Sequence, residues 1–354
     1  MTSIFVSALV MRYSNPILTL GMPIYNGERF LRETLESILN QTFENFELII
    51  SDNASTDKTQ AICQEYAAQD QRICYYCNDD NLGAARNYNR VFQLSKGTYF
   101  KWVAHDDLLA PEYLERCIEV LEQNSALVLC YSRTIFIDQE GNEIRKASSN
   151  LLQLTSPKPH QRFEQYQKLF FNKGRLDRQG SNLKEKPIKA DSDLTQHHPA
   201  GDRWLPIFGV IRSNLLKGTP LIASYVNSDA ILLGELALLG QFYEVPEYLF
   251  RYRDYGEASG RKHNGYYEYN VWFDPVNKNK IVMPLWRWFW EYLAAIQRSP
   301  LNRSETTLCY AQMAQWLRWM WQRLAKELLI TSLRALKINQ ISIGKIKKQL
   351  PTQW

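Results

Sequence analysis

The sequence has no run of about 20 uncharged apolar residues, the length that a helix needs to cross a bilayer. Residues 1–15, MTSIFVSALVMRYSN, are apolar but have no basic residue ahead of the hydrophobic stretch. A cleaved signal peptide normally begins with such a basic region. We therefore expect neither a membrane-spanning segment nor export, and we expect the protein to reside in the cytoplasm.

Cysteine is also sparse, and no cysteine cluster marks a disulfide framework or a zinc site. Cys74 and Cys77 form a C-x-x-C, but they lie in the strand-like run ICYYC, where residues three apart face opposite sides. The formal net charge of +5 is mild, and the excess of Lys and Arg lies largely in the last seventy residues. This balance does not favour nucleic acid as a partner; it suits an acidic ligand such as a nucleotide diphosphate, or an anionic membrane surface.

Strand-like and helical patterns alternate along the first 130 residues, and the composition of 45% hydrophobic and 22% charged residues is that of a folded protein. Such alternation predicts an α/β fold with a Rossmann-like, mainly parallel sheet flanked by helices, and with ligands beyond the carboxyl ends of the strands. A further strand and a tight turn at 138–142 are expected to extend the sheet. The strand-like runs are 17–20, 46–50, 73–77, 98–103, 127–131 and 134–137.

Polar side chains follow the first two predicted strands. After the first strand, Tyr25 can stack on a base and Asn26 can cap the following helix. After the second, Asp52 can accept hydrogen bonds from a base or ribose edge, while Ser55 or Thr56 can cap the next helix. These residue types predict a nucleotide at this edge of the sheet.

The third and fourth predicted strands also end in residues that suit a nucleotide diphosphate. Arg86 follows the third strand and can clamp a phosphate. Asp106 and Asp107 follow the fourth strand, and a divalent cation that bridges to a diphosphate would offset the cost of placing two adjacent carboxylates there.

The order of these segments resembles glycosyltransferase family 2 of bacterial type, the inverting enzymes of GT-A fold, over residues 16–260. The segments that carry the resemblance are Pro-Ile-Tyr-Asn at 23–26, Asp-Asn-Ala-Ser-Thr-Asp at 52–57 and Asn-Leu-Gly-Ala-Ala-Arg-Asn at 81–87. Together they are specific, although each alone is weak. The resemblance implies that the donor is bound by Pro23, Tyr25, Asn26, Glu28, Asp52, Asn53, Arg86, Asp106 and Asp107.

The resemblance also implies a divalent cation, Mg or Mn, held by Asp106 together with the donor diphosphate. Ala104 stands where the family's D-x-D motif has its first aspartate, so the affinity for metal is expected to be weaker. For the catalytic base the resemblance points to Asp229, which precedes the helical run 230–239. A downstream His-Pro loop of the family is replaced by Arg253-Asp254-Tyr255-Gly256.

Two parts are expected in the chain: a GT-A domain over residues 1–260, with a polar insert or lid at 172–203, and a helical extension over residues 261–354. The extension is rich in Trp, Lys and Arg, which suits the inner face of a membrane; the alternatives are that its helices pack on the catalytic domain or on a second subunit in a homo-oligomer. The expected donor is a nucleotide-diphosphate sugar, above all a UDP-sugar, and the expected acceptor is a hydroxyl of a polysaccharide, glycolipid or other glycoconjugate.

Two other functions stay open at this point. A degenerate GT-A module would bind a nucleotide without turnover, and Ala104 and Asp254 favour it. A sugar nucleotidyltransferase has a related fold, but it would need a glycine-rich, basic loop after the first strand, and residues 22–28 contain one glycine and no lysine.

Overall fold

A computed structural model describes residues 15–148, 152–171, 201–255, 266–278, 280 and 283–349. Up to residue 148 the elements are β1 (Leu18–Ile24), α1 (Leu31–Leu39), β2 (Phe46–Asp52), α2 (Thr59–Gln69), β3 (Ile73–Cys77), α3 (Ala84–Gln93), β4 (Tyr99–Trp102), β5 (Leu108–Leu109), α4 (Tyr113–Gln123), β6 (Leu127–Ile137) and β7 (Glu143–Lys146). The later elements are α5 (Pro159–Phe171), η1 (Gly201–Phe208), β8 (Val210–Arg212), α8 (Ser213–Leu216), α9 (Ser228–Leu239), β9 (Gln241–Arg253), α10 (Tyr266–Phe273), η2 (Pro275–Asn277), α11 (Pro284–Arg298) and α12 (Arg303–Gln349).

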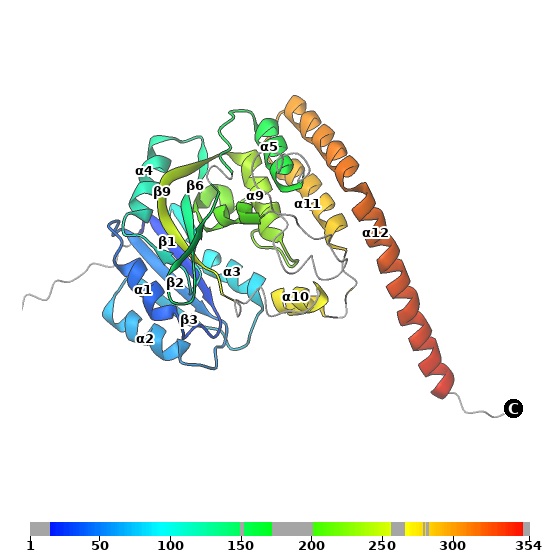
Figure 1. The fold of residues 1–354 in the computed structure, drawn as a ribbon, viewed down its shortest axis with the longest axis horizontal. Coiled ribbons are helices and arrows are strands. Elements are labelled where there is room, and N and C mark those ends of the chain that lie inside the picture. The colour runs from blue at the N-terminus through cyan, green and yellow to red at the C-terminus, as the bar shows by residue number, and fades with distance from the viewer. Residues whose placement is uncertain are drawn as a thin grey trace, which may run out of the picture.

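The described strands form one nine-stranded sheet in the order β3-β2-β1-β4-β8-β6-β9-β5, with β7 paired to β6 (Figure 1). The pairs among β3, β2, β1 and β4 are parallel, as the βαβ alternation predicts. Beyond β4 the sheet is mixed, because β8 runs antiparallel between β4 and β6 while β6 and β9 pair in parallel. The carboxyl ends of β1, β2 and β4 therefore meet at one edge, where their loops can form a common site.

The central strand β1 is buried along its whole length, which is typical of a strand covered by helices on both faces. Gly21 of β1 packs tightly against both α3 and β4. A Cβ at this position would lie 2.7 Å from the Phe100 ring of β4 and 2.7 Å from Val91 of α3. Glycine at this point allows the helix to pack directly on the strand.

The segment 127–137 is one strand rather than the two separate strands that the sequence predicted. Its pairing with β9 shifts register around Ser132 and Arg133, and these irregularities account for the interruption in the apolar pattern. The predicted turn at 138–142 and the strand after it are confirmed, because β7 pairs antiparallel with β6.

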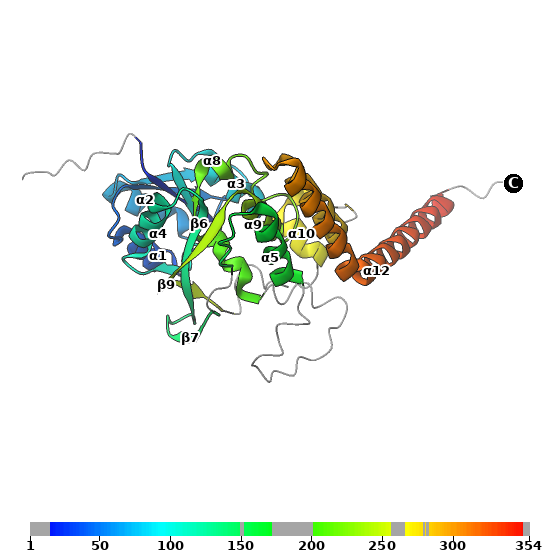
Figure 2. The same ribbon diagram turned by 90° about the horizontal axis from the view of Figure 1, so that it is seen from above.

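Helix α9 lies at the centre of the later part of the chain and is apolar around its circumference. Helices α5 and α11 pack on it, and α12 packs on both (Figures 1 and 2). With 47 residues, α12 is about 70 Å long, and its last part extends away from the body in both views. Within the described ranges, no helix combines the length and apolar character that crossing a membrane requires.

Most of the expected insert at 172–203 lies outside the described residues. Its last three positions belong to η1, a 3-10 helix whose apolar residues Leu205, Ile207 and Phe208 are buried in the core. The 3-10 helix η1 therefore includes residues 201–203, which the composition had assigned to the insert.

Candidate functional site

The loops that follow β1 and β2 are bonded to each other at the carboxyl edge of the sheet. The backbone N–H of Asn26 donates to Ser55 Oγ at 2.9 Å, and that of Thr56 donates to Asn26 Oδ1 at 2.8 Å. The backbone N–H of Glu28 donates to Asp57 Oδ2 at 3.1 Å. Each loop therefore fixes the other.

The predicted capping roles in these loops are wrong. Helix α1 begins after Phe30 and α2 after Lys58, and neither position has a side-chain cap. Asn26 has a φ of 51° and lies in the turn that precedes α1, so its side chain reaches the loop after β2 instead. Ser55 likewise accepts a hydrogen bond from Asn26 rather than from its own helix.

Asp52 and Asn53 are buried at the end of β2, with 0% and 3% of their surfaces exposed. Asp52 Oδ1 accepts the backbone N–H of Ser55 at 2.9 Å, and Oδ2 accepts the Tyr75 hydroxyl at 2.8 Å. Asn53 Oδ1 accepts the backbone N–H of Leu82 at 2.8 Å. Both side chains organise neighbouring loops, and their contact with a donor stays a prediction.

Two other predicted donor contacts differ sharply in access. Pro23 lies inside β1, paired in register with Ser51, and is buried. The Tyr25 side chain next to it is 42% exposed. Of the two, only Tyr25 presents an open aromatic face on which a base could stack.

Asp106 and Asp107 are held by Arg253, the last residue of β9, which is 1% exposed. Arg253 donates from its backbone N–H to Asp107 Oδ1 and from Nε to the Asp106 carbonyl, each at 2.9 Å. It also forms an ion pair with Glu33 at 2.7 Å. The Tyr255 hydroxyl donates to Asp106 Oδ2 at 2.9 Å.

Arg253 and Tyr255 are the site residues that sequence reasoning missed. They occupy the segment where the family has its His-Pro loop, and the sequence showed only that histidine was missing there. The strand 241–253 was not predicted from the sequence, so nothing indicated that Arg253 ends a strand and can reach the other strand ends of the sheet.

The two aspartates differ in burial. Asp106 is half-buried, whereas Asp107 is 5% exposed and its Oδ2 has no hydrogen-bond partner within the described part of the chain. Burial, followed by the charge of Asp106, raises the pKa of Asp107 well above its ordinary value. Asp106 is therefore the carboxylate of this pair that is better placed to meet a ligand.

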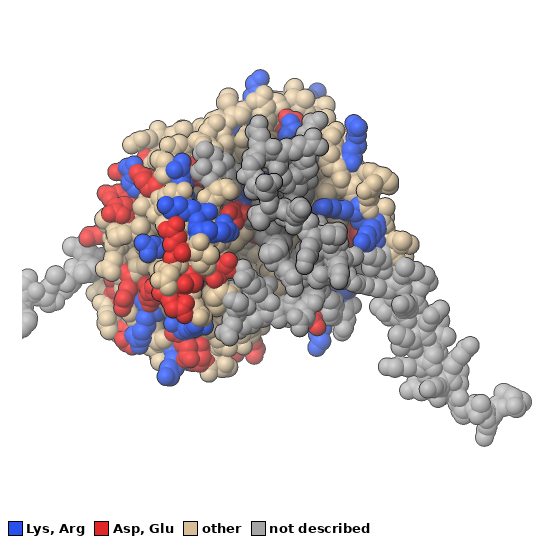
Figure 3. Space-filling view, viewed as in Figure 1, with Lys and Arg blue, Asp and Glu red and all other residues tan. Residues whose placement is uncertain are grey.

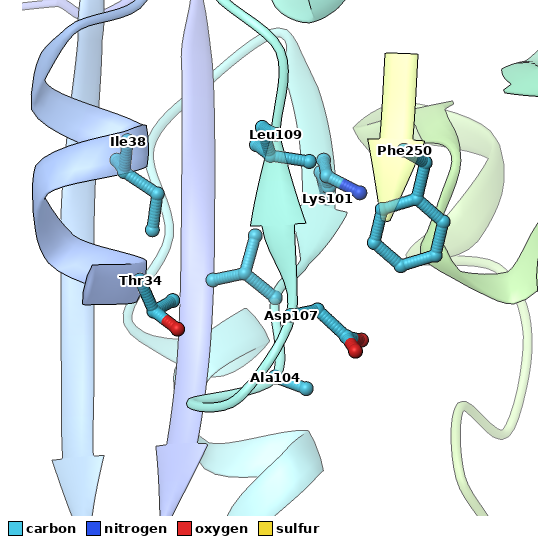
Figure 4. Close-up of a pocket in the computed structure, with 8 residues that line it drawn as sticks. Thr34, Ile38, Lys101, Ala104, Asp107, Leu109 and Phe250 are labelled. Carbon is cyan, nitrogen blue, oxygen red and sulfur yellow. The ribbon is translucent and has the colours of Figure 1, made fainter. Parts of the chain in front are cut away.

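Beneath Asp107 lies a small cavity that also borders Lys101 (Figure 4). Its volume of about 10 Å³ corresponds to one water molecule. Lys101 is fully buried, donates to the Phe208 carbonyl, and has Nζ 5.1 Å from the centroid of the Phe250 ring. Burial lowers the pKa of Lys101 to about 7. The other lining residues are Thr34, Ile38, Val103, Ala104 and Leu109.

Asp229 lies in the first turn of α9, after Asn227, which adopts a left-handed conformation. Its negative charge contributes to raising the pKa of the half-buried Tyr269, although burial is the larger cause. The pKa of Tyr88 is raised by burial and then by Asp106, Asp107, Tyr269 and Asp229. The charges of the candidate base and of the candidate diphosphate site therefore both raise the pKa of the same tyrosine, Tyr88.

Arg86 lies on α3 and is half exposed, but its guanidinium is not free. It forms an ion pair at 3.4 Å with Asp274, which is fully buried. Asp274 also accepts hydrogen bonds from Ser224 and from the backbone N–H of Val276. Arg86 therefore connects α3 to the segment before Asp229, and it borders a groove of about 250 Å³ together with Leu82, Asn89, Arg90 and Gln93.

Acidic and basic side chains alternate over the described surface around α1 and α2 (Figure 3). Ion pairs such as Arg32–Glu65, at 2.6 Å, account for part of this pattern. Among the residues whose positions are described, no group of three or more His, Cys, Asp or Glu side chains could hold a metal ion.

Sequence comparison with known proteins gives matches to the first half of the chain, and structural comparison gives matches to the fold. Residues 19–177 match the sequence model of glycosyl transferase family 2. An uncharacterised glycosyltransferase of Methanocaldococcus jannaschii is 33% identical over 140 residues, which are 39% of this chain and 48% of that protein. Chondroitin synthase of Escherichia coli is 33% identical over 129 residues, 36% of this chain and 19% of the synthase. The chain thus spans about half the length of these curated relatives, or less.

Among solved structures, S. aureus TarS 1–349 in complex with UDP superposes with a TM-score of 0.51 and 14% sequence identity. The match covers 86% of this chain and 72% of the TarS chain. At this identity the likeness concerns the fold, and it extends well beyond the residues that the family model matches.

Proposed function

Because residues 19–177 match the model of glycosyl transferase family 2 and the fold is similar to that of TarS, we propose that this chain is a family 2 glycosyltransferase of GT-A fold, which transfers a sugar from a nucleotide-diphosphate donor to an acceptor hydroxyl. The observation that carries the proposal is the meeting of loops 23–28, 52–57 and 104–107 at the carboxyl edge of β1, β2 and β4. Ligands of open α/β sheets bind at this kind of edge. Tyr25 and Asp106 are the accessible groups that suit a base and a metal-bound diphosphate.

The chemistry of the site fits a weakly held divalent cation. Asp106 supplies one half-buried carboxylate, and Mg²⁺ is often bound by one or two carboxylates together with substrate phosphates. Asp106 would hold Mg or Mn, and the cation would stabilise charge on the leaving diphosphate. Because Ala104 provides no second carboxylate, we propose that metal binding depends on the bound donor.

Asp229 is our candidate for the base that deprotonates the acceptor hydroxyl. A base on the face opposite the leaving nucleotide produces inversion in a single displacement. Tyr225 and Val226, both buried, fix the chain just before α9. The ion pair between Arg86 and Asp274 steadies the same segment through Ser224.

For the donor we propose a UDP-sugar, which the resemblance implies and which the likeness to UDP-bound TarS supports. The acceptor would be a hydroxyl in a polysaccharide, glycolipid or other glycoconjugate. Residues 1–260 would form the catalytic part, and residues 261–354 would contact an anionic membrane surface, at its cytoplasmic face, or a second subunit. Exposed Trp290 and Trp321, at 59% and 61%, favour such a contact.

The experiment that tests the function is a thermal-shift screen of UDP, GDP and their sugars, with and without Mn, on the wild type, Asp106→Asn and Glu44→Gln. Glu44 is an exposed carboxylate just before β2, at the opposite edge of the sheet, and serves as the matched control. We expect one nucleotide to stabilise the wild type and Glu44→Gln, and to stabilise Asp106→Asn much less.

Two results would redirect the proposal. If no nucleotide stabilises the wild type, donor binding at this edge is wrong. If a nucleotide sugar binds but its nucleotide diphosphate is never released during incubation with acceptors, the chain is a nucleotide-binding module without turnover.

A further inference from the structure

Tyr88 lies on α3, which is bonded both to the strand ends of the proposed donor site and to the segment before the residue proposed as the base. The preceding residue, Asn87, is 3% exposed and bonded to the end of β2, since its side-chain amide donates to the Ser51 carbonyl at 2.8 Å. The following residue, Asn89, bonds both the N–H and the carbonyl of Ile222, in the segment that leads to Asp229. The backbone of Tyr88 is therefore fixed from both sides.

A third anchor comes from the strand that carries the candidate metal ligand. Trp102, the last residue of β4, is fully buried and donates from its indole N–H to the Tyr88 carbonyl at 2.9 Å. The two rings are 6.5 Å apart and tilted by 39°. Because Ala104 and Asp106 lie in the loop that follows Trp102, Tyr88 keeps a constant position relative to the diphosphate site.

The hydroxyl of Tyr88 makes no hydrogen bond to the described part of the chain. The residue is half-buried. Burial, Asp106, Asp107, Tyr269 and Asp229 raise the pKa of this phenol, so it keeps its proton at neutral pH and can donate. The negative charges on both sides favour a neutral hydroxylated group as its partner.

We propose that Tyr88 positions the transferred sugar by donating a hydrogen bond to one of its oxygen atoms, and thereby contributes to the choice of donor sugar. This inference rests on the proposed function, because the sugar of a nucleotide-diphosphate donor must lie between the diphosphate and the base. A base–ribose contact by Tyr88 is the alternative that the test separates, since such a contact would affect the nucleotide with or without its sugar.

The test compares Tyr88→Phe with the wild type by calorimetric titration of two pairs of ligands: UDP with UDP-GlcNAc, and GDP with GDP-mannose. We expect Tyr88→Phe to weaken the sugar nucleotide that the wild type prefers by roughly 3- to 10-fold, the value of one hydrogen bond. Binding of the nucleotide diphosphate without sugar should not change. Tyr310→Phe, in an exposed tyrosine of α12, controls for loss of a phenol elsewhere.

The ratio of the two dissociation constants decides the outcome. If the ratio of the dissociation constants of the sugar nucleotide and the nucleotide diphosphate is the same in Tyr88→Phe as in the wild type, the inference is wrong while the proposed function stands. Equal weakening of both ligands is one such result. If the wild type binds none of the four ligands, the proposed function is overturned and the inference with it. A thermal unfolding curve of Tyr88→Phe that matches the wild type shows that the change is local.

Discussion

Lys101→Met removes a charge from the interior beneath the candidate site, and its effect on stability should depend on pH. The side chain is fully buried against the Tyr113 and Phe250 rings, so methionine keeps the packing and removes the amine. In the unfolded chain lysine has its ordinary pKa of 10.5, and in the folded chain burial lowers the pKa of Lys101 to about 7. Between these values the unfolded state binds more protons, so Lys101 makes the folded state more stable as the pH rises.

The size of the effect follows from the same two values. A group that is protonated only in the unfolded state changes the free energy of unfolding by roughly 1.4 kcal/mol per pH unit. From pH 7 to pH 9 the wild type should therefore gain about 2 kcal/mol relative to Lys101→Met.

Urea unfolding, followed by tryptophan fluorescence at pH 7, 8 and 9, measures this difference. Other titrating groups are common to both proteins and cancel in the comparison. Lys96→Met, at an exposed lysine in the loop before β4, should unfold in parallel with the wild type at every pH. Parallel pH profiles for the wild type and Lys101→Met would refute the reasoning, since they would mean that Lys101 keeps its ordinary pKa in the folded chain.

Two further predictions concern the base and the packing that holds it. Asp229→Asn should lower the rate of nucleotide diphosphate release by roughly 10²- to 10⁴-fold while the thermal shift with nucleotide persists, and near-normal turnover in the folded variant would exclude Asp229 as the base. Gly83→Ala should lower the free energy of unfolding by about 1–3 kcal/mol, because Gly83 has a φ of +83° and a Cβ there would lie 2.5 Å from Pro275. Gly218→Ala is its control, since the nearest atom to that Cβ is a carbonyl oxygen at 3.5 Å, and equal melting temperatures for the two variants would contradict the prediction.

The parts of the fold that the sequence predicted are those set by local patterns. The strands β1 to β4 and the helices between them follow from runs of apolar residues and their periodicity, and the helical runs at 230–239 and after Pro284 are confirmed for the same reason. The mixed half of the sheet could not be read in this way. Strand β8 has three residues, and its antiparallel place between β4 and β6 depends on pairings across 80 or more positions of the chain.

The site shows the same division between local and long-range information. Asp106 could be identified because it follows a strong strand pattern. Arg253, which holds it, is 147 positions away, and a basic residue at a strand end carries no mark of its partner. Asn26 was misjudged because its helix is close in sequence, whereas its hydrogen-bond partners lie about 30 residues away in the next loop.

Ala104, which stands where the resemblance places the first D-x-D aspartate, packs against buried residues beneath the loop. Ala104 borders the same small cavity as Lys101 and Asp107, so the loop packs inward on one side (Figure 4). Asp107 is buried there, and Arg253 bonds its carboxylate through a backbone N–H. Inward packing leaves Asp106 as the carboxylate of this loop that can face a donor. A single such ligand binds a cation weakly until the diphosphate adds its own oxygens. We therefore propose that metal and donor bind together at this loop, rather than the metal binding beforehand.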